Sequence, residues 1–389
     1  MVVSGAGALQ AVVLCGGLGN RMTDLTDYIP KCMLPIAGVI LVVAEALLAE
    51  IKQLLSGCTL PPLPNLHIEF VSLGTDAENW GTADVLRHIA DRIKKDFVVV
   101  SGDFVSDMSL SPMLALHSAE NSALTCLLTD RFITGPVPGL KARQSVGCDF
   151  IALAKNNQLL FIGSEEDYDE EVPMDLILLK KCRSALFTTA YNDCHVYIMK
   201  KWILNFIKMH RNFTSLKADV IPYILKKQFT KDGLELVENE PVDPLSELVQ
   251  KLSFGTAIAS RKQPAVRCFA YILTQENGYI IAHVNTIGAY FEVNKAIVRF
   301  LSSRFSEKFP TGQTVDTPNT PTGFECYVSA AAQFAVVQHT AAEEGEIAKP
   351  LLRSEKPIIK RSVIGANSII GMKTKIINSL VMDGCIIGP

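Results

Sequence analysis

The sequence lacks the residue spacings that metal-binding and disulfide-rich domains need. Its ten cysteines stand singly, with no CxxC pair, and its seven histidines include no HxxxH pair. Structural zinc sites are built from such closely spaced pairs, and disulfide frameworks are typical of short secreted chains. We therefore expect neither kind of site, and we expect the cysteines to be reduced thiols that pack as small hydrophobic residues.

The sequence also lacks a long apolar run and an excess of charge of one sign. The longest apolar candidate, residues 38–51, is interrupted by Glu45, whereas a membrane span needs about 20 apolar residues. The first apolar run is not preceded by lysine or arginine and ends in glycines, unlike a signal peptide. The net charge is only −3, which does not favour a nucleic acid or an anionic membrane as partner. We expect a cytosolic protein of two domains, with no membrane partner and no direct nucleic-acid partner.

Strand-like and helix-like segments alternate through the first half of the chain. This alternation predicts an α/β domain with a Rossmann-like, mixed but mostly parallel sheet that is covered by helices. Ligands of such sheets bind at the carboxyl ends of the strands, where the loops at Gly16 and Asp103 are expected. The segments are strands over 9–17, 66–73 and 97–107 and helices over 38–55 and 81–96.

The second half of the chain is predicted to be more varied. Residues 148–163 are typical of a hairpin that turns at Asn156-Asn157, and residues 192–207 indicate a strand followed by a helix. Residues 214–229 indicate a helix that is interrupted at Pro222. We expect three parts: a nucleotidyltransferase-like domain over 8–240, a connector and strand-rich extension over 241–350, and a β-helix over 351–389.

The β-helix is predicted from aliphatic residues that recur about every six positions at the end of the chain. Three of them are followed by glycine, and this period is the signature of a left-handed parallel β-helix. The alternative is a chance string of short strands. A short β-helix leaves aliphatic edges such as Ile386 uncovered, and we expect these edges to contact a partner chain. The recurring residues are Ile364, Ile370, Ile376, Val381 and Ile387.

Three glycines after the first strand suggest a phosphate-binding loop. Gly16, Gly17 and Gly19 let the backbone N–H groups approach phosphates closely, and Arg21 and Lys31 follow as cations that can neutralise a triphosphate. The alternative is a strand-to-helix turn that only serves folding. The spacing GGxGxRMxxLTxxxPKxxLP, which ends with Leu34-Pro35, resembles the signature of the sugar-1-phosphate nucleotidyltransferases.

Two further stretches carry the same resemblance. Residues 80–87, WGTADVLR, are similar to the motif with which these enzymes contact the base, which implies a role for Gly81 and Thr82. Residues 98–107, VVVSGDFVSD, are similar to the motif whose aspartate holds Mg²⁺, and Asp103 matches that aspartate. Many members of the family also carry a β-helix after the nucleotidyltransferase domain.

The sequence departs from the enzymes at two places that matter for catalysis. The second metal-binding aspartate of the enzymes matches Asn285 here, unless another carboxylate such as Asp193 replaces it. The lysine that contacts the sugar phosphate has no counterpart after the hairpin, where residues 165–171 are mostly acidic and should repel a phosphate. His195 lies on a predicted strand, and we interpret it as a structural histidine.

This profile resembles the noncatalytic subunits of eukaryotic translation initiation factor 2B, and among them the gamma family. The resemblance rests on the motifs above and on stretches such as DFIALAKNNQLLFIGSEEDYDEE, VIPYILKKQF and IKRSVIG. It implies a regulatory or scaffold subunit of the guanine-nucleotide exchange factor for initiation factor 2, which pairs directly with the epsilon subunit and assembles with alpha, beta and delta. It also implies no catalytic residue, no metal and no cofactor in this chain.

Two alternatives stay open at this point. One is a weakly bound GTP or nucleotide sugar at a vestigial site. The other is an active sugar-1-phosphate nucleotidyltransferase. The residues of the vestigial nucleotide site would be Gly16, Gly17, Gly19, Arg21, Lys31, Gly81, Thr82 and Asp103.

Overall fold

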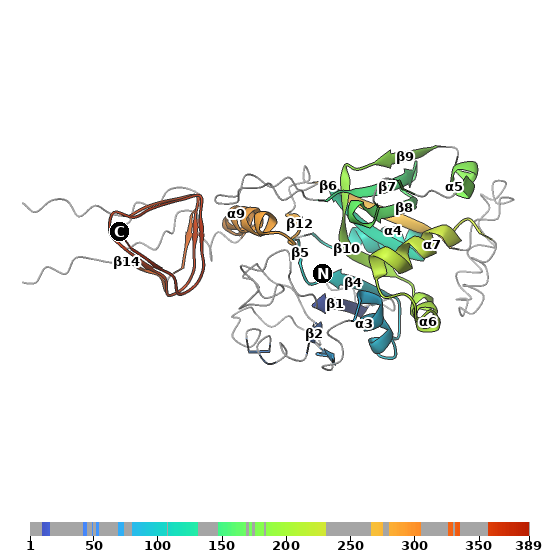
Figure 1. Ribbon diagram of the computed structural model, residues 1–389, viewed down its shortest axis with the longest axis horizontal. Coiled ribbons are helices and arrows are strands. Elements are labelled where there is room, and N and C mark those ends of the chain that lie inside the picture. Colours follow the sequence, from blue (N-terminus) through green and yellow to red (C-terminus); the bar gives the residue numbers. More distant parts are fainter. Residues whose placement is uncertain are drawn as a thin grey trace, which may run out of the picture. The chain divides into compact units, whose positions relative to one another are not determined.

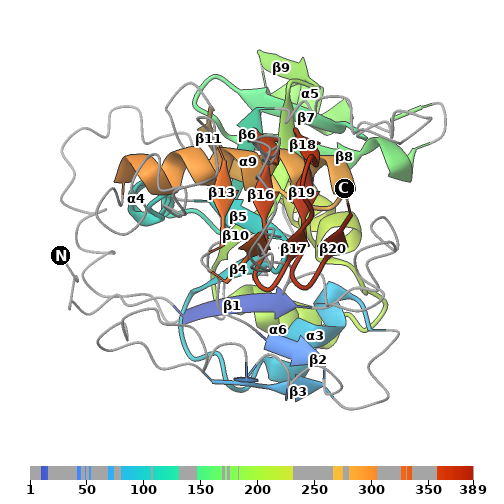
Figure 2. The same cartoon turned by 90° about the vertical axis from the view of Figure 1, so that its left-hand side faces the viewer.

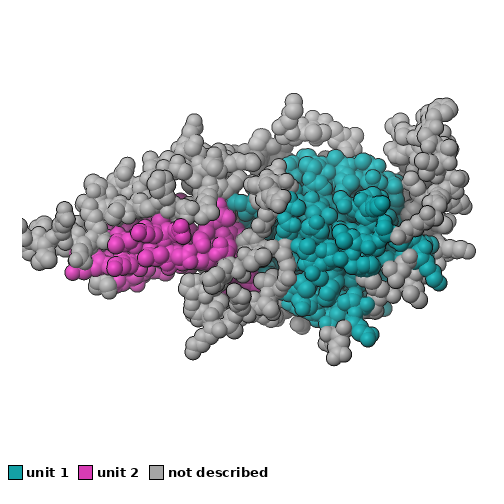
Figure 3. All heavy atoms as spheres, turned by 90° about the horizontal axis from the view of Figure 1, so that it is seen from above, with its two compact units in different colours: residues 1–133, 140–285 teal, residues 134–139, 286–389 magenta. Residues whose placement is uncertain are grey.

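A computed structural model of the chain divides into two compact units (Figure 3). Unit 1 comprises residues 1–133 and 140–285, and unit 2 comprises residues 134–139 and 286–389. The residues that the structure describes are 10–15, 42–44, 49, 52–53, 69–73, 80–106, 108–130, 147–168, 171–172, 176–182, 184–230, 266–274, 280–304, 326–329, 331–334 and 357–388.

Unit 1 is built on a seven-stranded sheet with the strand order β11-β6-β10-β4-β1-β2-β3 (Figure 1). Every neighbouring pair is parallel except those of β10, which runs antiparallel to both β4 and β6. The predicted mixed, mostly parallel sheet is therefore confirmed. The strands are β1 (Gln10–Cys15), β2 (Val42–Ala44), β3 (Ser72–Leu73), β4 (Phe97–Ser101), β6 (Leu124–Asp130), β10 (Tyr191–Met199) and β11 (Cys268–Leu273).

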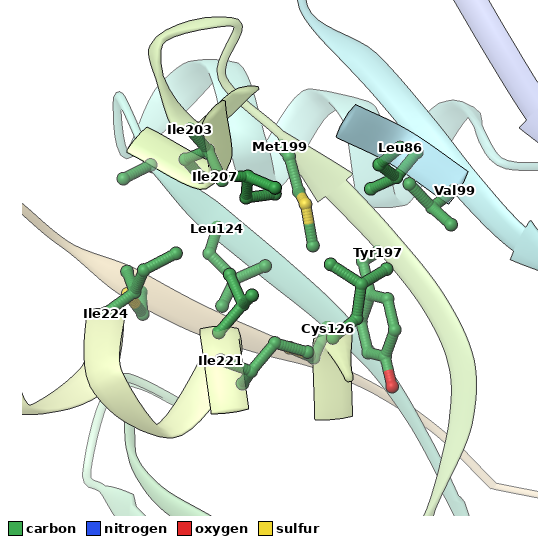
Figure 4. Packing of buried hydrophobic residues seen from close by; sticks show 14 of the residues in the cluster. Leu86, Val99, Leu124, Cys126, Tyr197, Met199, Ile203, Ile207, Ile221 and Ile224 are labelled. Atoms are coloured by element: carbon green, nitrogen blue, oxygen red, sulfur yellow. The ribbon is translucent and has the colours of Figure 1, made fainter. Parts of the chain in front are cut away.

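The central strands are apolar on both faces because helices cover both sides of the sheet. One face buries alternate residues of the strands against α3, α6 and α7, as Figure 4 shows in close-up, and the other face buries the intervening residues against α4. Burial on two sides explains why these strands read as nearly continuous apolar runs. The helices are α3 (Thr82–Ile89), α4 (Ser111–Ala119), α6 (Trp202–Met209) and α7 (Ile221–Lys227).

Two smaller sheets complete unit 1. In the first, β12 (Ile281–His283) pairs antiparallel with β5 (Phe104–Ser106), just after the end of β4. In the second, the order is β8-β7-β9, and Asn157 has a φ of 59° in the turn between β7 and β8. This hairpin is the one that the sequence predicts around Asn156-Asn157. Its strands are β7 (Asp149–Ala154), β8 (Leu159–Ser164) and β9 (Ala185–Thr188).

Short helical turns connect these elements. A 3-10 turn, η3 (Glu165–Asp167), follows β8, and α5 (Leu176–Lys181) precedes β9. A π-helical turn, η4 (Leu216–Val220), leads directly into α7, which has Pro222 in its first turn. Proline is accepted there because the first N–H groups of a helix have no partner within the helix. The predicted interruption at Pro222 is thus a change from a π-helix to an α-helix.

The predicted helix over 38–55 is wrong at its beginning. Val42–Ala44 form strand β2, which pairs with β1 through Leu14 opposite Val42 and Cys15 opposite Val43. The segment has helical spacing, but its β-branched residues also suit a sheet, and pairing with a strand nearly thirty residues earlier decides the outcome. Helical structure is present further on, at residues 49 and 52–53.

The segment 241–350, which we expect to be a connector and strand-rich extension, supplies strands to both units. Strand β11 pairs with β6 at one end of the main sheet of unit 1, and β12 pairs with β5. Strands β13 and β14 pair with strands of the β-helix in unit 2. The segment 241–350 therefore supplies structural elements on both sides of the division between the units.

Unit 2 contains α9 (Ile287–Arg304) and a parallel β-helix with three faces (Figures 1 and 2). From β15 onward, successive coils pair residues that are 17 positions apart, such as Val363 and Leu380. The corners hold residues with positive φ, among them Asn367 at 55° and Gly384 at 70°. Its strands are β13 (Tyr327–Val328), β14 (Gln333–Phe334), β15 (Ile358–Lys360), β16 (Val363–Ile364), β17 (Ile369–Ile370), β18 (Lys375–Ile377), β19 (Leu380–Val381) and β20 (Ile386–Ile387).

The aliphatic residues of the six-residue period form the core of the β-helix. Ile364 and Ile370 are fully buried, while their neighbour Ile369 points outward and is 38% exposed. The first coil also includes β13 and β14, so the β-helix begins before residue 351. Among the helices in the described ranges, none is long and apolar enough to cross a membrane.

Candidate functional site

The structure describes three of the residues predicted to form a nucleotide site: Gly81, Thr82 and Asp103. The other five belong to the glycine-rich loop and the stretch after it, within residues 16–41, and lie outside the described residues. Their predicted role therefore stays a prediction. These five residues are Gly16, Gly17, Gly19, Arg21 and Lys31.

Asp103 lies where the sequence predicts it, in the turn that follows β4 at the carboxyl end of the sheet. The N–H of the preceding Gly102 donates to the carbonyl oxygen of Leu14 at 2.8 Å, which places this turn beside the end of β1. Ser101 Oγ donates to Asp103 Oδ1 at 2.5 Å, and the Val284 N–H donates to the Asp103 carbonyl oxygen at 2.7 Å. The turn that carries this carboxylate is thus fixed between the ends of three strands, β1, β4 and β12.

His283 occupies the position opposite this carboxylate. Its Nε2 atom lies 2.9 Å from Asp103 Oδ1 without forming a hydrogen bond, and the contact is an ion pair only when the imidazole is protonated. The ring of His195 lies 4.3 Å from the ring of His283, measured between centroids. Burial lowers the pKa of His195 well below its ordinary value, with further repulsion from His283 and Lys217, so His195 stays neutral at neutral pH.

His195 itself is held in an unusual backbone conformation. Its φ is 54°, and it lies in an irregularity of β10, where the pairing with β6 shifts between Asp193 and Tyr197. Such bulges redirect a side chain away from the regular alternation of a strand. Here the bulge brings the His195 ring against His283, a contact that strand periodicity does not predict.

Asn285 is the second residue after β12, and its N–H donates to the carbonyl oxygen of His283 at 3.1 Å. The residue that matches the second metal-binding aspartate is therefore close in the chain to the partners of Asp103, but it carries no charge. Within the described part of the chain, no three histidine, cysteine, aspartate or glutamate side chains are grouped so that they could hold a metal ion. Magnesium is usually held by one or two carboxylates together with substrate phosphates, and Asp103 supplies one such carboxylate.

Asp193, the alternative second carboxylate, already binds groups within the chain. Its Oδ1 accepts a hydrogen bond from the His195 N–H at 3.0 Å, and its Oδ2 accepts one from the Tyr197 hydroxyl at 2.5 Å. Burial raises the pKa of Asp193, although Lys217, Tyr197 and His195 act in the opposite direction. Both oxygens have donors, so Asp193 acts as a structural group of β10.

A partly buried ion pair lies next to Asp193. Lys217, from η4, places its Nζ atom 2.8 Å from Asp149 Oδ1, and Asp149 Oδ2 accepts the Asp193 N–H at 2.8 Å. Burial lowers the pKa of Lys217, but the carboxylates of Asp193 and Asp149 outweigh it, so the pKa is raised overall. The sequence analysis missed Lys217, because a single lysine on a helical turn gives no signal that it will meet two distant aspartates.

The first three residues of the acidic stretch after the hairpin are exposed. Glu165, Glu166 and Asp167 form η3, and no residue of this turn is buried. Glu165 Oε2 accepts hydrogen bonds from the Cys148 N–H at 3.0 Å and from its Sγ at 3.2 Å. These contacts tie the start of η3 to the start of β7, while the repulsion of a sugar phosphate stays a prediction.

Gly81 and Thr82 contact another segment of the chain. A Cβ atom at Gly81 would lie 2.1 Å from the carbonyl oxygen of Thr214, which only glycine avoids. The Ala83 N–H donates to that same oxygen at 2.8 Å, and Thr82 Oγ1 accepts the Leu216 N–H at 2.8 Å. The first turn of α3 is thereby attached to the segment that begins η4.

Arg87 strengthens the same attachment one turn later. Its guanidinium donates to the carbonyl oxygens of Ile207 at 3.0 Å, His210 at 3.1 Å and Phe213 at 2.9 Å, and it pairs with Asp84. Asp84 also accepts the Gly81 N–H at 3.0 Å, which completes the N-terminal cap of α3. The residues of the stretch WGTADVLR that make these contacts therefore attach α3 to the segment between α6 and η4.

Comparison with known proteins assigns the family. The sequence model of the nucleotidyl transferase family, described as "Nucleotidyl transferase", matches residues 10–132. The chain is 32% identical over 308 residues to the translation initiation factor eIF2B subunit gamma of Caenorhabditis elegans, covering 74% of this chain and 68% of that protein.

Two further relatives extend the comparison. The gamma subunit of Schizosaccharomyces pombe is 26% identical over 316 residues, covering 75% of this chain and 65% of that protein. The eIF2B subunit epsilon of Dictyostelium discoideum is 22% identical over 241 residues, covering 56% of this chain and 33% of that protein. The chain thus spans about two thirds of the length of the gamma subunits and a smaller part of the epsilon subunit. With its nucleotidyl transferase domain and its β-helix, the chain belongs to the family of the translation initiation factor eIF2B gamma subunits.

Proposed function

We propose that this chain is a noncatalytic regulatory or scaffold subunit of the guanine-nucleotide exchange factor for initiation factor 2. In this proposal it pairs directly with the epsilon subunit, assembles with alpha, beta and delta in the cytosol, and supports GDP release from initiation factor 2. The family assignment supports this role, because the two kinds of subunit named above are parts of one factor.

The contact between Asp103 and His283 carries the noncatalytic part of the proposal. A phosphoryl-transfer site needs Mg²⁺ held by carboxylates that face the substrate phosphates. Here the Asp103 carboxylate faces the His283 ring at 2.9 Å, and an asparagine stands at position 285. We infer that the imidazole, whose Nε2 lies this close to Oδ1, competes with a metal ion for that carboxylate oxygen.

The alternative function is an active sugar-1-phosphate nucleotidyltransferase, which the match to the nucleotidyl transferase family favours. This alternative needs a second metal ligand and a cation for the sugar phosphate. Asp193 is engaged by Tyr197 and His195, and Lys217 is paired with Asp149, so neither group is available without rearrangement. The proposed subunit works without a cofactor, and weak binding of GTP or a nucleotide sugar remains compatible with it.

The outward side chains of the β-helix suit a subunit that assembles with partners. Ile369 and Ile386 lie opposite each other on β17 and β20 and are 38% and 78% exposed. Ile377, on strand β18 of the same β-helix, is 55% exposed. Aliphatic side chains that point outward from a β-helix suit contact with another chain.

Two measurements on the purified protein test the proposal. We expect no Mg²⁺-dependent release of pyrophosphate when the chain is given a nucleoside triphosphate with glucose-1-phosphate, mannose-1-phosphate or N-acetylglucosamine-1-phosphate. We also expect equal amounts of the chain and the epsilon subunit when a tagged chain is captured from cells. Clear pyrophosphate release, together with recovery of the chain alone, would establish the enzyme instead.

A further inference from the structure

Among the described strands, β9 lies at the edge of the smaller sheet in unit 1. The sheet order is β8-β7-β9, and β8 continues to the main sheet through the bridge between Gln158 and Phe269. On the opposite side, the described residues provide no strand that pairs with the outer edge of β9. An edge strand presents unpaired N–H and C=O groups that can accept a further strand.

The two central side chains of β9 are large, apolar and exposed. Leu186 is 59% exposed and Phe187 is 47% exposed. Leu186 lies opposite Leu153, and Phe187 lies opposite Ala152, and both partners on β7 are buried. Opposite residues of paired strands point to the same face of the sheet. Leu186 and Phe187 are therefore the exposed outer ends of two rows of apolar side chains, and each row continues to a buried residue of β7.

The sequence of β9, ALFT, has none of the devices that commonly protect an edge. It contains no proline and no charged residue, and its pairing with β7 is regular, without a bulge. Protected edges usually carry lysine, proline or a bulge. With only four residues, β9 can pair with a short strand, whose side chains would extend both apolar rows and bury Leu186 and Phe187.

The sequence segment that contains β9 is basic, in a protein with a net charge of −3. Between Leu176 and Asn192 the sequence contains Lys180, Lys181 and Arg183 and no acidic residue. Lys180 and Lys181 are exposed at the end of α5, which lies beside β9 in both Figure 1 and Figure 2. A strand that binds here is therefore favoured when acidic residues flank its apolar ones.

We propose that β9 pairs with an extended segment of another subunit of the exchange factor. This segment carries apolar side chains on both of its faces and acidic residues next to Lys180 and Lys181. The inference rests on the proposed function, because it takes its partner from the assembly that this function requires.

Photo-crosslinking in the complete reconstituted assembly tests the pairing. A benzoylphenylalanine in place of Phe187 should crosslink to another subunit, within a segment that contains acidic and apolar residues. The matched control replaces Met209, which is 78% exposed at the end of α6 in the same unit, and should give no crosslink to that segment. Absence of a crosslink from position 187 to another subunit would overturn the inference, as would a crosslink to a second copy of this chain or to a segment without acidic residues.

A second variant separates this inference from the proposed function. We expect Leu186→Glu to weaken association with the crosslinked subunit roughly tenfold, because it repels the acidic segment and interrupts one apolar row. Met209→Glu should leave this affinity unchanged. If the wild-type chain joins the assembly and Leu186→Glu binds equally well, the β9 inference fails while the proposed function stands. If the wild-type chain joins no assembly at all, the proposed function fails first.

Discussion

The guanidinium of Arg87 joins α3 to the end of α6 and the loop that follows it. It donates to three backbone carbonyl oxygens, from Ile207, His210 and Phe213, and its side chain is only 19% exposed. Removing it leaves these acceptors without their donor in a partly buried place, and hydrogen bonds from a charged donor are among the stronger ones in proteins.

We therefore predict that Arg87→Ala lowers the free energy of unfolding by about 3 kcal/mol. Urea unfolding followed by circular dichroism measures this change. Lys208→Ala is the matched control, because Lys208 pairs with Asp91, whose side chain is 89% exposed, and surface pairs contribute little. Equal losses in the two variants would show that the three carbonyl contacts do not stabilise the fold.

The residues that define the site differ in how far the sequence could have predicted them. Asp103 was predictable, because a short β-branched strand that ends in Gly-Asp places the aspartate at the carboxyl edge of a parallel sheet. His283 and Lys217 were not predictable, because His283 is 180 positions from Asp103 in the sequence and Lys217 is 68 positions from Asp149, so both contacts depend on the folded sheet. Contacts of this kind follow from topology, which local patterns do not encode.

Helix α4 is fixed to β6 by a buried histidine. His117 Nδ1 lies 2.8 Å from Thr125 Oγ1, and within the described part of the chain its Nε2 has no hydrogen-bond partner. Burial lowers the pKa of His117 from 6.5 to about 4, with a smaller contribution from Lys200 and an opposing one from Asp96. The folded protein therefore holds this side chain neutral where the unfolded chain would protonate it.

This difference predicts a loss of stability in mild acid. Because the pKa is lower in the folded state, the contribution is fully present above about pH 6.5 and is lost as the pH falls toward 4. Between pH 7 and pH 4, the wild type should lose about 3 kcal/mol more unfolding free energy than His117→Asn, which does not titrate. Parallel stability curves for the two proteins over this range would contradict the lowered pKa.

Individual elements were predictable where a local pattern and the final contacts agree. The hairpin of β7 and β8 was predicted by its Asn-Asn turn, and the β-helix by its six-residue period, because both depend on neighbours in the sequence. Strand β2 was not predicted, because its residues also suit a helix and its pairing with β1 decides between the two. Strands β13 and β14 have no period of their own and join the β-helix only through β16 and β17.

The molecule as a whole combines two units with separate hydrophobic cores. The sheet and helices of unit 1 enclose one large cluster around residues such as Leu124 and Met199, and the β-helix of unit 2 encloses another around Ile364 and Ile370. Each core is built from residues of one unit only. A scaffold subunit can use such an arrangement to present two surfaces, a nucleotidyltransferase-like one and a β-helical one, to its partners.

Separate cores predict that damage to one unit leaves the other intact. Ile370 is fully buried in the β-helix, so Ile370→Ala removes apolar contacts and leaves a cavity that costs about 3 kcal/mol. Hydrogen exchange followed by mass spectrometry should show faster exchange over residues 357–388 and unchanged exchange in β4, β6 and β10. The control is Ile386→Ala on the neighbouring face strand, where the side chain is 78% exposed and its loss should change neither region in the isolated chain. Faster exchange in β4, β6 and β10 together with that of the β-helix would show that the two units unfold as one cooperative body. The partners of the chain would then bind a single structural unit.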